Sequence, residues 1–112
     1  MGPYTPVVRA GGWLVASGQL GLSGGALVDG GTGAELAQAV ANLSDLLVGE
    51  GASLADVVKT TVFLRDMADF PQVNEVYARI LGDARPARST VAVLGLPRGV
   101  AVEIEAVVKL PA

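Results

Sequence analysis

The fold of this chain is decided by a stretch near its C-terminus, Pro86-Ala87-Arg88-Ser89-Thr90-Val91-Ala92-Val93, followed by Val102-Glu103-Ile104-Glu105-Ala106. Apolar residues alternate with small or charged ones in both segments, which is typical of β-strands with one buried face. The Gly/Pro connection of residues 94–99 suits neighbouring antiparallel strands, although other strand orders stay open. We therefore expect two strands here, within residues 86–93 and 102–109.

Each of these segments carries a charged side chain that could bind a ligand or take part in catalysis. Arg88 lies at the start of the first strand, and Glu103 lies within the second. If the pairing of the two strands offsets Arg88 and Glu103 by about three residues, their α-carbons lie about 10 Å apart. Both side chains could then contact a small molecule bound between them. From the residues alone, a surface salt bridge is the simpler role for Arg88. Glu103 and Glu105 point to one strand face about 6.8 Å apart, so the spacing does not choose between them.

The first half of the chain predicts a hairpin and a helix. The hairpin spans residues 7–18, with its turn at Gly11-Gly12, where positive φ angles suit glycine. Thr32 and Glu35 match a capping box, so a helix is expected from Thr32 to about Gly49. Its apolar stripe repeats every three or four residues, which indicates packing and not chemistry.

The second half continues the alternation of strands and helices. After a short strand at 26–28, we expect a capped turn at 53–56 and a strand at 57–65. That strand is apolar on both faces, which is typical of a central strand covered on each side. A second helix is expected to be capped by Asp69 and to end at Gly82.

This order predicts a single α+β domain over residues 1–112, with both helices on one face of a sheet. The other face would then need cover from outside the chain. Hydrophobic residues make up 51% of the sequence, which is rich for so small a domain. Both observations favour an oligomer, because large exposed apolar patches are a liability for a monomer.

Composition excludes several classes of function. The chain has no cysteine and no histidine, so disulfides, thiolate metal sites and the commonest general base are unavailable. Its net charge of −3 argues against nucleic-acid binding. No apolar run is long enough for a membrane span and no signal peptide opens the chain, so a cytoplasmic location without membrane partners is expected. We expect neither a metal nor a cofactor.

Five blocks carry a resemblance to a known family. They are Gly2-Pro3-Tyr4, Ala16-Ser17-Gly18-Gln19, residues 56–64, Val73-Asn74-Glu75-Val76-Tyr77, and the C-terminal stretch quoted above. In this order they resemble the reactive intermediate deaminases (the RidA or YjgF-type family) over nearly the whole chain. The resemblance implies a chorismate-mutase-like α+β fold, a mixed sheet with two helices on one face. It also implies a homotrimer with sites in clefts between subunits.

The resemblance also implies roles for single residues. Arg88 matches the arginine that binds the substrate carboxylate, and Glu103 matches the carboxylate associated with the hydrolytic water. Four further residues match substrate-binding positions of the pocket, namely Tyr4, Ser17, Gly18 and Asn74. Thr90, also placed in the substrate site, stands where many relatives carry cysteine.

The implied reaction is hydrolysis of small anionic 2-imino acids, such as 2-iminopropanoate and 2-iminobutanoate, or of their enamine tautomers. The products are 2-keto acids and ammonia. Imines hydrolyse readily once oriented, so an arginine and a water-positioning carboxylate suffice. Two alternatives stay open, a non-catalytic trimer that binds small carboxylic acids and a ribonuclease or translation inhibitor. The acidic charge and the absence of histidine argue against the second.

Overall fold

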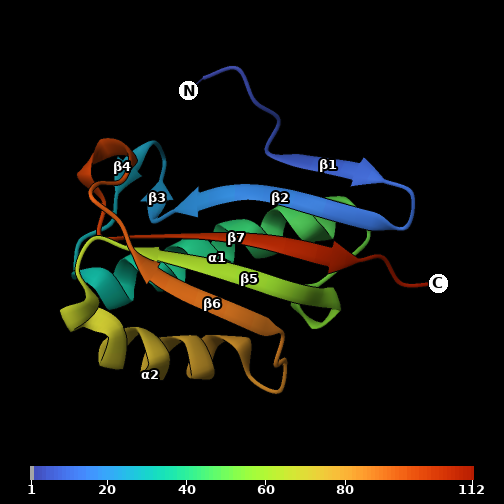
Figure 1. Ribbon diagram of the computed structural model, residues 1–112. Coiled ribbons are helices and arrows are strands. Elements are labelled where there is room, and N and C mark those ends of the chain that lie inside the picture. Colours follow the sequence, from blue (N-terminus) through green and yellow to red (C-terminus); the bar gives the residue numbers. More distant parts are fainter. Residues whose placement is uncertain (1) are drawn as a thin grey trace.

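The computed structural model describes residues 2–112, as a β-sheet with two helices packed on one face (Figure 1). This confirms the expected α+β class. None of the helices in this part of the chain combines the length and hydrophobicity that crossing a membrane requires. In chain order the elements are β1 (Val7–Ala10), β2 (Trp13–Leu20), β3 (Leu22–Ser23), β4 (Ala26–Leu27), α1 (Thr32–Gly49), η1 (Leu54–Asp56), β5 (Val57–Leu64), η2 (Met67–Asp69), α2 (Phe70–Leu81), β6 (Ala87–Ala92), η3 (Pro97–Gly99) and β7 (Val102–Lys109).

Five strands form one mixed sheet in the order β1-β2-β7-β5-β6, and β3 and β4 pair separately. β6 runs parallel to β5, and the other neighbours are antiparallel. The favoured arrangement of the two C-terminal strands as neighbours is therefore wrong, since β5 lies between them. The reason is α2, which returns the chain from the end of β5 to the start of β6 and makes that pair parallel. The 93–101 connection then crosses the end of β5, where its two ends bond to Leu64 and Arg65.

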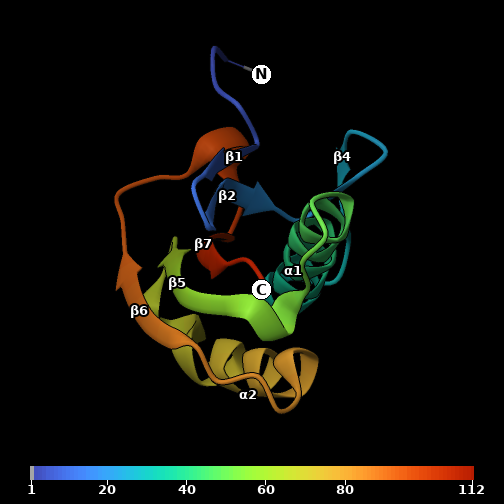
Figure 2. The same ribbon diagram turned by 90° about the vertical axis from the view of Figure 1, so that its right-hand side faces the viewer.

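The core lies between the sheet and the two helices, which also contact each other (Figure 2). In β7 every second side chain is buried, as its alternation predicts. α1 and α2 supply the opposing apolar side chains at their three- and four-residue spacing. The fully buried contributors from β5 and β7 are Val62, Leu64, Val102, Ile104 and Val108.

The predicted N-terminal caps of the two long helices are wrong, because neither helix start is capped by a side-chain hydrogen bond. α1 begins after Gly31, and no side chain caps it. The Thr32 hydroxyl instead donates to Asp69 Oδ2 at 2.8 Å, and buried Glu35 accepts a hydrogen bond from the backbone N–H of Ala101 at 2.9 Å. Asp69 therefore binds α1 and does not cap its own helix. These bonds tie the start of α1 to α2 and to the segment before β7. The capped turn expected at 53–56 is confirmed.

The face of the sheet opposite the helices, here the helix-free face, is partly open in the single chain. The strand expected to be covered on both sides, β5, is buried on its helix side and only half-buried on the other. Valines and one tryptophan lie uncovered on β1, β2 and β6, with Trp13 42% and Val15 48% exposed. The need for cover from outside the chain, inferred from the order of the elements and supported by composition, thus has a defined location.

Candidate active site

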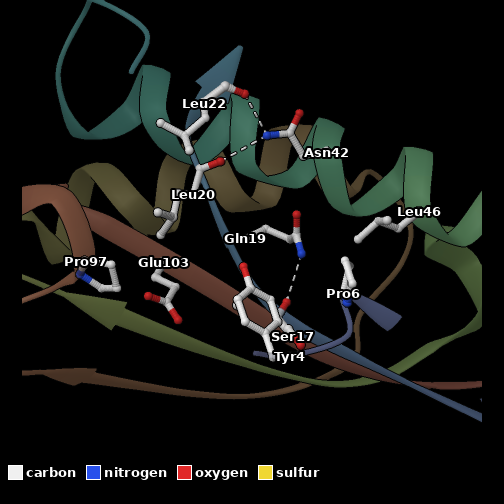
Figure 3. Close-up of a pocket in the computed structure, with 11 residues that line it drawn as sticks. Tyr4, Pro6, Ser17, Gln19, Leu20, Leu22, Asn42, Leu46, Pro97 and Glu103 are labelled. Carbon is white, nitrogen blue, oxygen red and sulfur yellow. Dashed lines mark hydrogen bonds between the residues drawn. The ribbon is translucent and has the colours of Figure 1, made fainter. Parts of the chain in front are cut away.

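One pocket of about 540 Å³ opens beside β2 and β7 (Figure 3). Four predicted site residues line it: Tyr4, Ser17, Gly18 and Glu103. Seven further lining residues were not predicted from the sequence, namely Pro6, Gln19, Leu20, Leu22, Asn42, Leu46 and Pro97. The walls are largely apolar, with a few polar groups, which is typical of a small-molecule site.

A β-bulge in β2 shapes this pocket. The pairing of β2 with β7 shifts between Ala16 and Gln19, so Ser17 and Gly18 together face one residue of β7. Such a bulge bends its strand and redirects side chains, and bulges occur often beside active sites. The sequence left open whether Gly18 marks a bulge or a close approach. The structure shows both.

The close neighbour of Gly18 is the side chain of Glu103. A β-carbon at Gly18 would overlap the Glu103 carboxylate and would lie 2.6 Å from its Cδ. A larger residue at position 18 would therefore displace the Glu103 carboxylate from this place. Burial raises the pKa of the Glu103 carboxyl above its ordinary value, and the nearby Glu105 carboxylate raises it further. A carboxylate with a raised pKa is a stronger base once it is ionised.

The N-terminal segment is fastened over the pocket by Ser17. Its hydroxyl donates to the carbonyl of Thr5 at 2.8 Å, and its backbone N–H donates to the carbonyl of Pro6 at 2.8 Å. These bonds hold Tyr4, 55% exposed, at the rim of the pocket. The hydroxyl proton of Ser17 is thus engaged with the backbone, and the side chain supports the rim.

Asn42 shows that α1 contributes more than packing. Its Nδ2 donates to the carbonyls of Leu20 and Leu22, at 3.0 and 2.9 Å (Figure 3). Its Oδ1 accepts a hydrogen bond from Gln38 Nε2. It thereby holds the end of β2 and β3 against α1 at the pocket wall. In the sequence Asn42 was merely a residue off the apolar stripe, and no local pattern links it to Leu20 or Leu22.

Arg88 and Asn74 lie together at another place, between β6 and α2. Arg88 Nη2 donates to Asn74 Oδ1 at 2.7 Å. The guanidinium carbon lies 4.8 Å from the ring centre of Tyr77 and 5.6 Å from that of Phe70. Such stacking is favourable and fixes the plane of the guanidinium.

Thr90 lies two residues after Arg88, on the same face of β6, and its register partner is Val62. Its hydroxyl oxygen is buried and has no hydrogen-bond partner within residues 2–112. A buried hydroxyl without a partner is costly. The Thr90 hydroxyl is therefore free to donate a hydrogen bond beside Arg88.

Within one chain, Arg88 and Glu103 lie on opposite faces of the sheet. Arg88 pairs with Thr60, which is buried beneath the helices, whereas Glu103 alternates with the buried Val102 and Ile104. Paired residues of neighbouring strands share a face, and successive residues of a strand alternate. β5 also separates the two strands. The two side chains therefore cannot bracket one molecule within a single subunit.

Residues 2–112 contain no group of three acidic, histidine or cysteine side chains arranged to hold a metal ion. The groups available to a substrate are a guanidinium, a carboxylate, hydroxyls, amides and the backbone. Together these can bind an anion and orient water.

A family model described as endoribonuclease L-PSP matches residues 1–110. The chain belongs to this family. The sequence blocks had indicated the same RidA and YjgF-type group, and that prediction is confirmed.

Three similar proteins show how differently relatives of this chain are named. The 2-iminobutanoate/2-iminopropanoate deaminase of Mus musculus is 46% identical over 96% of this chain and 81% of its own length. The mitochondrial protein mmf1 of Schizosaccharomyces pombe is 41% identical over 95% of this chain and 67% of its own length. The crystal structure of Escherichia coli TdcF with bound serine has a TM-score of 0.93 at 32% identity, covering 99% of this chain and 91% of that one.

Proposed function

We propose that this protein hydrolyses reactive 2-imino acids of the 2-iminopropanoate and 2-iminobutanoate type to 2-keto acids and ammonia. The observation that carries the proposal is Glu103, a carboxylate of raised pKa at the wall of a largely apolar pocket. Relatives named as deaminases for these two substrates support the choice of reaction.

In the proposed reaction, Arg88 binds the substrate carboxylate and the Thr90 hydroxyl donates a further hydrogen bond to it. The ionised Glu103 orients a water molecule and accepts one of its protons as the oxygen attacks the imine carbon. Glu103 passes this proton to the imine nitrogen, so the C=N double bond becomes a single bond and a carbinolamine forms. Glu103 then takes the proton of the carbinolamine hydroxyl and gives it to the same nitrogen. The C–N bond breaks as the C=O bond forms, ammonia leaves, and the 2-keto acid remains. This scheme requires no metal or cofactor.

The proposed site includes residues from two subunits. Because Arg88 and Glu103 lie on opposite faces of one sheet, a shared site needs Arg88 of one copy beside the pocket of the next. A cyclic trimer repeats such a head-to-tail contact three times and closes it. It would also cover apolar side chains of the helix-free face, which a monomer leaves exposed.

This assembly predicts a solution mass near three times 11.3 kDa. Light scattering coupled to size exclusion would measure it at micromolar concentration, with dilution as a check that the assembly is stable. A monomer that persists over the same concentration range would contradict both the trimer and the shared site.

The pH profile tests the role of Glu103. The base must be ionised, so kcat/KM is expected to rise with pH through the raised pKa of Glu103. Glu105→Gln removes the neighbouring negative charge, lowers that pKa, and moves the acidic limb of the profile to lower pH. Rates are measured after subtracting uncatalysed hydrolysis, and Glu75→Gln on the exposed face of α2 is the matched control. An acidic limb that stays in place or moves to higher pH in Glu105→Gln would contradict this role.

Direct turnover tests the proposed function itself. An amino acid oxidase generates 2-iminobutanoate from 2-aminobutanoate, and release of 2-oxobutanoate is followed with and without this protein. We expect acceleration in proportion to protein concentration. No acceleration, together with saturable binding of 2-oxobutanoate, would instead identify the non-catalytic carboxylate binder.

The family description also names an endoribonuclease. The net charge of −3 and the absence of histidine weigh against that activity. Salt-dependent RNA binding or RNA cleavage by the purified trimer would support the endoribonuclease against the deaminase.

A cytoplasmic location is also a proposal, which cell fractionation would test.

A further inference from the structure

One face of α2 surrounds the Arg88 side chain. Phe70, Asn74 and Tyr77 recur at four- and three-residue steps and therefore share a stripe of the helix. Asn74 accepts a hydrogen bond from Arg88 Nη2 at 2.7 Å, and the rings of Phe70 and Tyr77 lie 5.6 and 4.8 Å from the guanidinium carbon. We call these three residues the arginine seat.

We propose that the arginine seat consists of positioning residues, which aim one edge of Arg88 at the substrate carboxylate. This inference rests on the proposed function, in which Arg88 binds that carboxylate. A guanidinium has five N–H donors in one plane. Asn74 engages Nη2, and the rings lie against the guanidinium, so the remaining donors are left for a two-pronged contact.

The seat is itself fixed to the sheet beneath Arg88. Tyr77 is 8% exposed, and its hydroxyl lies 2.7 Å from the Oγ1 of Thr60, which is 2% exposed. Thr60 is the register partner of Arg88 across β5 and β6. The path from Arg88 through Tyr77 to Thr60 therefore returns to the strand beside Arg88. Movement of α2 relative to the sheet would break the hydrogen bond or the stacking.

Such a seat is expected to act on affinity. A free arginine side chain loses rotational freedom when it binds a carboxylate, and a side chain already held in place loses less. The benefit is present in the ground state and in the transition state alike. Loss of the seat should therefore raise KM and leave kcat nearly unchanged.

The experiment measures Kd for 2-oxobutanoate by calorimetry and KM and kcat for 2-iminobutanoate. Asn74→Ala and Tyr77→Leu are each expected to weaken Kd and KM about tenfold, with kcat within about twofold. Tyr77→Phe keeps the ring and should stay within about threefold of the native protein. Asn74→Asp should weaken binding more than Asn74→Ala, because its carboxylate pairs with Arg88 and competes with the substrate. Glu75→Gln, on the exposed side of α2, is the control, and trimer mass is checked for every variant.

A double-mutant cycle separates positioning from direct contact. In an Arg88→Ala background, Asn74→Ala should cause no further loss, because its effect passes through Arg88. A further tenfold loss would show that Asn74 contacts the substrate and would overturn the inference. So would a fall in kcat at unchanged KM. Since calorimetry needs no turnover, a native protein that binds 2-oxobutanoate but hydrolyses no imine would contradict the proposed reaction and not the seat. A native protein that binds no keto acid would contradict both.

Discussion

Arg88→Ala is expected to lower kcat/KM for 2-iminobutanoate by about a hundred- to several-thousand-fold. Hydrogen bonds between charged groups contribute about 1.5–3 kcal/mol each, so losing a two-pronged contact costs roughly 3–5 kcal/mol. An acidic chain offers little other attraction for an anion, which makes compensation by neighbours small. Initial rates at low substrate concentration measure this ratio directly.

Two further arginine variants sharpen this prediction. Arg88→Lys keeps the charge but not the planar fork, so it should recover only part of the lost activity. Arg98→Ala is the matched control, because exposed Arg98 contacts the carbonyl of Gly25 and is not among the residues that line the pocket. Near-normal activity in Arg88→Ala would remove the basis of the proposed function. So would a loss explained entirely by a broken trimer, since Arg88 would then be structural.

Glu103→Gln is expected to lose most turnover, by about a hundred- to ten-thousand-fold in kcat, while still binding carboxylate ligands. The amide keeps the shape that packs over Gly18, but it cannot accept a proton from water. Measuring kcat for 2-iminobutanoate and Kd for 2-oxobutanoate on the same preparation separates the two effects.

Glu105→Gln is the matched control for Glu103. Glu105 is exposed on the same strand face and lies outside the pocket lining. It should retain much more activity above the acidic limb of the pH profile. Equal losses in the two variants, or the reverse order, would contradict the choice of Glu103 as the base. A Glu103→Gln protein that no longer binds 2-oxobutanoate would mean that Glu103 acts in binding.

Much of the fold could be predicted from the sequence because local periodicity reports which side of an element is buried. Strand order could not, since the connection between β6 and β7 suits either a hairpin or a step across a third strand. The caps failed for a related reason. Thr32 and Glu35 have the spacing of a capping box, but Asp69 and the Ala101 N–H bind them instead.

The candidate site, too, could be predicted from the sequence only in part. Tyr4, Ser17, Gly18 and Glu103 meet at one pocket, and the resemblance had grouped them. Asn42 was missed, because its role depends on backbone carbonyls of β2 and β3 that only the folded chain brings near. The separation of Arg88 from that pocket also depends on the strand order.

The most direct test of the shared site is complementation between Arg88→Ala and Glu103→Gln. The two variants are co-expressed with different tags, and trimers that contain both are purified through both tags. In a cyclic trimer of either composition, one of the three contacts joins an intact Arg88 to an intact Glu103. Mixed trimers should therefore show about a third of the native 2-iminobutanoate turnover, while each variant alone stays near background. Mixed trimers no more active than the separate variants would contradict a site built from two subunits.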